Sequence, residues 1–97
     1  MLSEAAVSRL RQYCNRAVYS RSDLVDNGMG RECRYLDADL RRIIWRDSEV
    51  RDVLIRAGED RNAWDALVAS VGRDRGLGLL DLVSAMSLEA RLTGVDG

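Results

Sequence analysis

Arginine is the side chain in this sequence with the greatest capacity for specific chemistry, because it supplies every positive charge. The chain of 97 residues contains 15 arginines, no lysine and no histidine. A guanidinium group donates paired hydrogen bonds to carboxylates or phosphates, so it suits binding to acidic proteins and to nucleic acids. A GC-rich genome also favours arginine over lysine, so this composition does not by itself indicate a binding function.

The densest group of arginines lies in a segment, residues 31–46, that is predicted to be helical. Apolar residues recur on one side of this helix, and arginines and aromatic residues fall on the opposite side. The outward side carries Arg31, Arg34, Tyr35, Arg41, Arg42, Trp45 and Arg46. Guanidinium groups beside aromatic rings are typical of surfaces that bind acidic protein or phosphate. We expect a protein partner here, with two alternatives: a nucleic acid, or rings that pack on a neighbouring helix while the arginines are merely solvated.

A second candidate is the glycine-rich segment 72–78, which runs into the last predicted helix. Backbone amides at a helix start could hold an anion together with nearby arginines. The candidate anion-binding residues are Arg73, Arg75, Gly76 and Gly78. No strand precedes the segment and its spacing matches neither phosphate-loop motif, so a flexible link between helices is the competing interpretation.

The last predicted helix, residues 79–92, is apolar on nearly all sides. Such a helix is either central in its own bundle or shared with a partner. If it is shared, Leu82, Leu88 and Leu92 would form a homodimer interface. A purely structural homo-oligomer is therefore a third hypothesis for the function.

Residues 50–71 have the outline of a helix-turn-helix, with Gly58 in the turn. The second helix would offer Asn62, Asp65 and Ser70 to a DNA groove, and Arg61 is its only positive charge. That composition is poor for binding a polyanion, so DNA reading by this element is disfavoured.

The sequence offers little for catalysis or metal binding. Without histidine or lysine, no nucleophile–base pair of the usual kinds can be assembled, so we expect no enzymatic activity and no cofactor. Structural zinc normally takes four Cys or His ligands, and the chain has two cysteines and no histidine. No metal is expected, and Cys14 and Cys33 are predicted to be reduced core residues rather than a disulfide.

The elements that position these residues are predicted to be helices throughout. Apolar residues recur at three- and four-residue spacing, and there is no proline. Five helices are expected: residues 3–19 with Ser3 as N-cap, 31–46, a third capped by Asp47 or Ser48, a fourth capped by Asp60, and 79–92. Residues 20–30 are predicted to be a connection, and Ile43 to lie in the core stripe of the second helix. The fold class is therefore all-α, a compact bundle of short helices forming a single domain, residues 1–97.

Charge and hydropathy limit the classes of partner and the compartment. The net charge is −1, so no global field attracts nucleic acid or a membrane surface. No apolar run approaches the length of a membrane helix, and the first residues lack the basic and apolar regions of a signal peptide. We therefore expect a cytoplasmic protein without a membrane association. Small chains of this kind would suit regulators or inhibitors, including those encoded by phages and mobile elements.

Overall fold

The computed structural model of the chain describes residues 2–26 and 38–94, with side chains for residues 2–17 and 38–94. Within these residues the chain is all-α, as predicted. The elements are α1 (Glu4–Asp26), α2 (Ala38–Arg46), α3 (Ser48–Ala57), α4 (Arg61–Val71), a short 3₁₀ turn η2 (Arg73–Arg75) and α5 (Gly76–Thr93). Among these helices, none is both long enough and apolar enough to cross a membrane.

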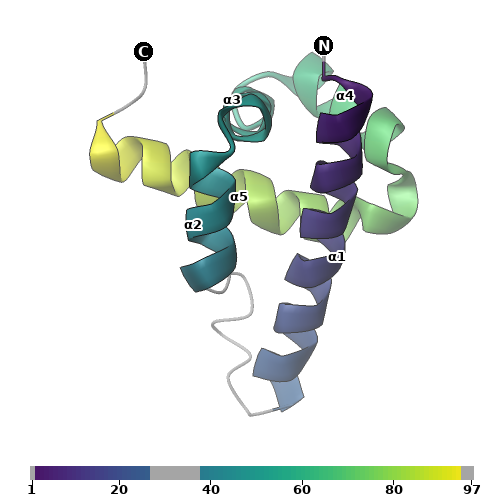
Figure 1. Cartoon of the computed structure of the whole chain (residues 1–97), viewed down its shortest axis with the longest axis vertical. Helices are drawn as coiled ribbons and strands as arrows, with labels where there is room; N and C mark the ends of the chain where they lie inside the picture. The colour runs from purple at the N-terminus through teal and green to yellow at the C-terminus, as the bar shows by residue number, and fades with distance from the viewer. Residues whose placement is uncertain (1, 27–37, 95–97) are drawn as a thin grey trace.

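The helices pack around α5. Figure 1 shows α1 and α2 on the near side of the molecule, with α5 running across behind them. The most extensive contact joins α1 to α5, and α3 packs on both α4 and α5. Helix α4 returns to α1, where the Arg11 guanidinium donates a hydrogen bond of 2.8 Å to the carbonyl of Ser70. Every described helix therefore contacts either α1 or α5.

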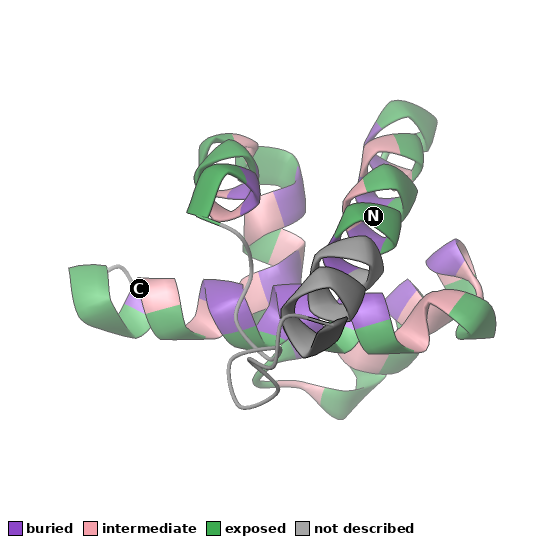
Figure 2. Cartoon of the chain, turned by 90° about the horizontal axis from the view of Figure 1, so that it is seen from below, coloured by how far each residue is buried: buried purple, intermediate pink, exposed green. Residues whose placement is uncertain are grey.

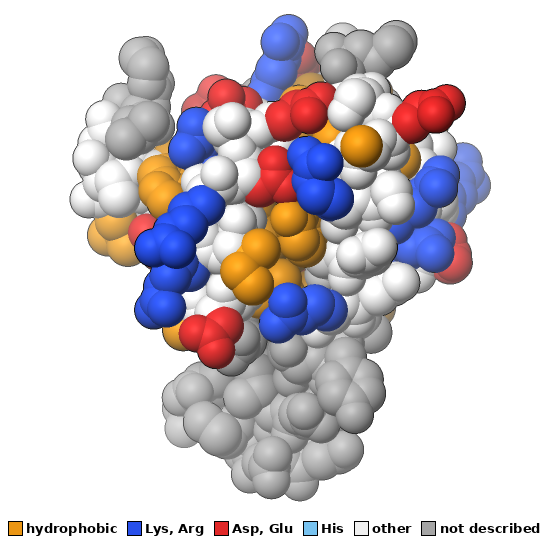
Figure 3. All heavy atoms as spheres, viewed as in Figure 1, with side chains coloured by type: hydrophobic (Ala, Val, Ile, Leu, Met, Phe, Trp, Pro, Cys, Tyr) orange, Lys and Arg blue, Asp and Glu red, His pale blue; other side chains and the backbone are white. Residues whose placement is uncertain are grey.

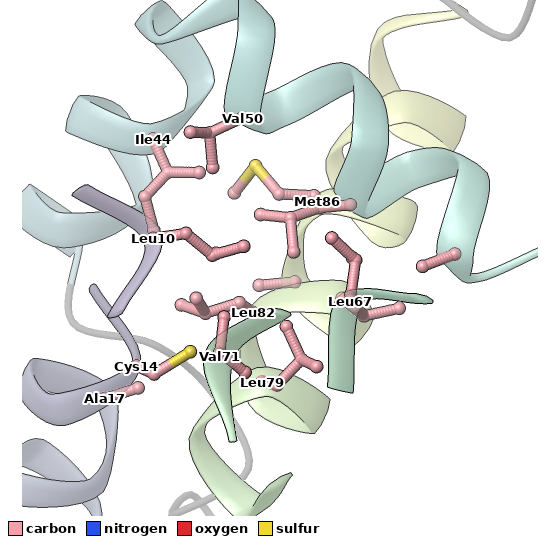
Figure 4. Close-up of a cluster of buried hydrophobic side chains, with 14 of the residues drawn as sticks. Leu10, Cys14, Ala17, Ile44, Val50, Leu67, Val71, Leu79, Leu82 and Met86 are labelled. Carbon is pink, nitrogen blue, oxygen red and sulfur yellow. The ribbon is translucent and has the colours of Figure 1, made fainter. Parts of the chain in front are cut away.

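One apolar core fills the space between the helices (Figure 4). Each helix contributes the residues that recur on its inner face, as the three- and four-residue spacing predicts. Its fully buried larger side chains are Leu10, Cys14, Leu40, Ile44, Val50, Leu54, Val71, Leu79, Leu82 and Met86. Figure 2 shows this buried stripe along the inward side of the helices and an exposed outer end on α5. The thiol of Cys14 is free, and burial raises its pKa to about 12. Cys33 lies outside the described residues.

Several helix ends agree with the sequence. The Ser3 hydroxyl accepts a hydrogen bond from the Ala6 amide, and the Asp60 carboxylate accepts one from the Asn62 amide. Both side chains thus satisfy amide groups that a helix start leaves without a partner. At the far end of α5, Gly94 adopts a left-handed conformation with φ 74° and donates to the carbonyl of Ala90.

Three local predictions are wrong. Helix α1 does not end near residue 19 but continues to Asp26, because serine and aspartate only mildly disfavour a helix and no glycine or proline interrupts this segment. Helix α5 begins at Gly76, so two of the glycines predicted to form a link lie in its first turn. Ile43 is 43% exposed, because the buried stripe of α2 is centred on Leu40 and Ile44 and Ile43 lies at its edge.

The contact between α1 and α5 depends on Gly78. This residue is buried, and a Cβ atom at its position would collide with the carbonyl oxygen of Cys14 and lie 3.0 Å from the carbonyl carbon. The obstacle is backbone, which cannot move aside as a flexible side chain can. Only glycine therefore permits the two helices to approach this closely.

We expect Gly78→Ala to lower the free energy of unfolding by about 1–3 kcal/mol, the usual cost of overpacking a well-filled core. Chemical denaturation monitored by circular dichroism measures this change. Gly76→Ala is the matched control, because nothing lies within 4 Å of a Cβ atom there and the backbone is already helical. That control should be neutral or stabilising, since alanine favours a helix over glycine by about 1 kcal/mol. Equal effects of the two substitutions would contradict the role given to Gly78.

Candidate functional site

The candidate site is the outer side of α2. Burial of Leu40 and Ile44 fixes the rotation of this helix, so Arg41, Arg42, Trp45 and Arg46 are placed around its remaining surface. Side chains four residues apart lie on the same side of a helix, which pairs Arg41 with Trp45 and Arg42 with Arg46. The other predicted members of the site, Arg31, Arg34 and Tyr35, lie outside the described residues.

A hollow of about 260 Å³ lies between α2 and α5 at this site. It is lined by Ala38, Arg41, Arg42, Trp45 and Glu89. Figure 3 shows arginine side chains following α2 on this side of the molecule. The structure therefore brings three of the predicted binding residues together around one concavity and adds an acidic residue, Glu89, from α5. We call the six residues Ala38, Arg41, Arg42, Trp45, Arg46 and Glu89 the α2 face.

Two arginines of the α2 face lie near carboxylates of the chain. Arg41 lies 3.7 Å from the carboxylate of Glu89, and Arg42 lies 3.8 Å from that of Asp39. The second pair is highly exposed, and such pairs contribute little stability. Arg46 is also exposed. The guanidinium groups of Arg42 and Arg46 can thus meet a ligand at small cost to the fold.

Trp45 is both a packing residue and a wall of the hollow. It is half-buried and packs against the core, so the interpretation that it packs on neighbouring helices is partly correct. The guanidinium of Arg51 lies 5.3 Å from the centre of the ring and donates a hydrogen bond to the Trp45 carbonyl. This cation–π contact holds the indole in place. A fixed aromatic ring loses little entropy when a partner covers it.

The residues predicted to form an anion-binding loop have other roles in the fold. Arg75 donates a hydrogen bond of 2.9 Å to the carbonyl of Val71 at the end of α4, and Arg73 is exposed. Gly76 lies in the first turn of α5, while Gly78 is covered by α1 and cannot approach an anion. The prediction is therefore wrong for Gly78, because close helix packing and not anion binding requires glycine there.

The predicted dimer residues of α5 divide into two groups. Leu82 is fully buried in the core, so its placement at an interface is wrong. Leu88 and Leu92 are 37% and 73% exposed, as that hypothesis requires. Two further exposed leucines, Leu77 and Leu80, were missed, although their spacing to Leu88 places all three on one side of the helix.

A second hollow, of about 530 Å³, lies where the turn between α3 and α4 meets α5. Trp64, Leu80 and Val83 give it apolar walls, while Glu59, Asp60 and Arg91 bring charge to its lining. We call it the α4–α5 groove. No sequence motif indicated it, because its two sides, residues 57–64 and 80–91, come from separate segments of the chain.

A polar cluster that no sequence pattern indicated joins α1 to the start of α3. Asp47 caps no helix with its side chain; its carboxylate accepts from Arg9 Nε at 2.8 Å, Arg9 Nη2 at 3.2 Å and the Tyr13 hydroxyl at 2.9 Å. These hydrogen bonds, above all those from Arg9, lower the pKa of Asp47. Burial raises the pKa of Tyr13, and its hydrogen bond to Asp47 adds to the effect. The groups satisfy one another, so the cluster stabilises the fold.

Within the described part of the chain, no group of three or more histidine, cysteine or acidic residues is placed to hold a metal ion. Comparison with known proteins finds no family model, no curated protein and no solved structure that matches. The function must therefore be argued from the surfaces alone.

We expect Asp47→Asn to lower the free energy of unfolding by about 1 kcal/mol at pH 7, because it weakens charge-assisted hydrogen bonds at a carboxylate that is only 14% exposed. The folded pKa of Asp47 is depressed, so its contribution is complete above about pH 4 and disappears as the pH falls through the folded pKa. Urea titrations from pH 7 to pH 2 should show the two proteins converging in acid. Asp52→Asn, at an exposed carboxylate that pairs with Arg51, is the control and should change little. A constant difference at all pH values would contradict this role for the Asp47 carboxylate.

Proposed function

We propose that this protein binds the acidic surface of a protein partner through the α2 face and acts without catalysis, as a regulator or inhibitor of that partner. The observation that carries the proposal is the hollow lined by Arg41, Arg42 and Trp45. Arginine and tryptophan are the residues that contribute most often to the energetic centre of protein interfaces. A half-buried indole can anchor an apolar group, while the exposed guanidinium groups bind carboxylates around it.

A protein partner is favoured over a nucleic acid by the acidic residues of this site. Glu89 lines the hollow and Asp39 lies beside Arg42, so phosphates entering the site would approach two carboxylates. A protein surface can place its own basic or polar groups opposite these residues. Nucleic-acid binding instead depends on several phosphate contacts without nearby repulsion. The nucleic-acid interpretation is kept as an outcome of the test, and the cytoplasmic location stays a prediction.

We expect Arg42→Glu/Arg46→Glu to weaken partner binding at least tenfold without changing the melting temperature, because both residues are exposed and steer association. Tagged wild type and variant are used as baits in lysate of the source organism, before and after nuclease treatment. Arg61→Glu is the matched control, an exposed arginine on α4 away from the α2 face. The proposal requires that the wild type and the Arg61→Glu control both retain one protein and that the double variant does not. Nuclease treatment must not release this protein. Retention of the same proteins by all three baits, or release of every retained protein by nuclease, would contradict it.

Two substitutions of Trp45 distinguish its contribution to partner binding from its contribution to stability. Trp45→Ala should cost about 2 kcal/mol of stability, less than the loss of a fully buried ring, because part of the ring is exposed. It should also lower affinity for the retained protein by about 2 kcal/mol or more. Trp45→Phe keeps most of the packing, so it should melt close to wild type and still bind more weakly. Unchanged affinity in both variants would exclude Trp45 as the anchor.

A further inference from the structure

The outer side of α5 carries an unusually apolar stripe for an exposed surface. Helical spacing aligns five exposed residues along it: Leu77, Leu80, Ser84, Leu88 and Leu92. The stripe extends over 15 residue steps, about 22 Å at the rise of an α-helix. Single exposed leucines are ordinary, whereas a continuous row of this length marks an interaction surface.

The order of residues along the stripe is symmetric about Ser84. Leu80 precedes this serine by four residues and Leu88 follows it by four. If a second α5 lies antiparallel with Ser84 opposite Ser84, each Leu80 meets the Leu88 of the other copy. Leu77 then lies opposite Arg91, whose alkyl chain can cover a leucine while its charge stays in water. A surface complementary to itself under a twofold rotation is what a symmetric dimer requires.

The small size of Ser84 fits this arrangement. A serine at the crossing point lets two helices approach closely, and the larger leucines on either side then interlock. The stripe proper contains no charged residue, so the juxtaposition creates no repulsion at its centre. Arg91, which also lines the α4–α5 groove, lies seven residues from Ser84 toward one end of the stripe and so is away from the centre of the crossing.

The α4–α5 groove enlarges the apolar surface that the stripe offers to a second copy. A stable interface covers about 800 Å² on each partner, more than one row of leucines supplies. The groove continues the stripe directly, because Leu80, Ser84 and Arg91 line it from α5. Its opposite wall adds the half-buried Trp64 from α4, so the combined surface extends across α5 onto a second helix.

We propose that the chain forms a symmetric dimer in which the α5 stripes of two copies pack antiparallel about Ser84, with the α4–α5 groove completing the interface. This inference is independent of the proposed function. Glu89 of the α2 face lies about half a turn around α5 from Ser87 and Arg91 of the groove, so the α2-face hollow of each copy stays open in the dimer. The protein would therefore present two identical binding faces to its partner, which raises apparent affinity for a partner with repeated sites.

Sedimentation equilibrium of the full chain at micromolar concentrations tests the dimer. Leu80→Asp and Leu88→Asp should each weaken self-association at least tenfold and leave thermal unfolding of the monomer nearly unchanged, since both leucines are exposed. Ile43→Asp is the matched control: Ile43 on α2 is 43% exposed, against 49% for Leu80, and lies away from the stripe. The control should dimerise like wild type. A wild type that stays monomeric up to about 100 micromolar would overturn the proposal, and so would a weakening of self-association by Ile43→Asp equal to that of the stripe variants. If Leu88→Asp does not fold, Leu80→Asp by itself decides the test.

The register is tested by cross-linking in a Cys33→Ser background, in which the remaining native thiol, Cys14, is buried. Ser84→Cys should form a disulfide between copies under mild oxidation, because the twofold axis brings the two residue-84 side chains together. Ala66→Cys, an exposed position on α4, is the control and should remain monomeric on non-reducing gels. Equal cross-linking at both positions, or none at residue 84 in a protein that sediments as a dimer, would overturn the antiparallel arrangement.

Discussion

The direct packing of Gly78 on the backbone of Cys14 sets the distance between α1 and α5, and the other helices are arranged around that pair. Because no side chain separates the helices at this point, Leu10 and Cys14 of α1 reach the same core as Leu82 and Met86 of α5. Close-packed interiors tolerate little added volume, so a single methyl group here would displace one of the two main elements.

Helix α5 also determines where the candidate surfaces lie. One edge of this helix supplies Glu89 to the hollow at the α2 face, and the other supplies Leu80 and Arg91 to the α4–α5 groove. The other exposed leucines, Leu77, Leu88 and Leu92, lie between these edges. A helix that is apolar on nearly all sides can thus be a core element and a surface element at once, because its inner residues are covered by α1 and α3 while its outer stripe is left open.

The arginines that make hydrogen bonds within the chain have a different role from the exposed arginines of the α2 face. Arg9, Arg11, Arg51 and Arg75 each donate to a carbonyl or carboxylate of another part of the chain, and so they join elements together. Arg42 and Arg46 make no comparable contribution to the fold, since they are exposed on α2. These six arginines therefore divide by position into those that support the structure and those that can meet a partner.

The sequence by itself determined the fold class and most of the described helix ends, because these depend on local spacing and on caps such as Ser3 and Asp60. It also indicated Arg41, Arg42 and Trp45 as neighbours, since they lie within one turn or so of a single helix. Only the tertiary structure decided that Ile43 faces outward, that Leu82 is core while Leu80 is exposed, and that Asp47 binds Arg9 and Tyr13. These outcomes depend on which neighbour covers each side of a helix, and periodicity within one helix carries no information about that. The same reason explains why the sequence wrongly predicts Gly78 to be an anion-binding residue: the helix that requires a glycine there, α1, contacts it through Cys14, more than 60 residues earlier in the chain.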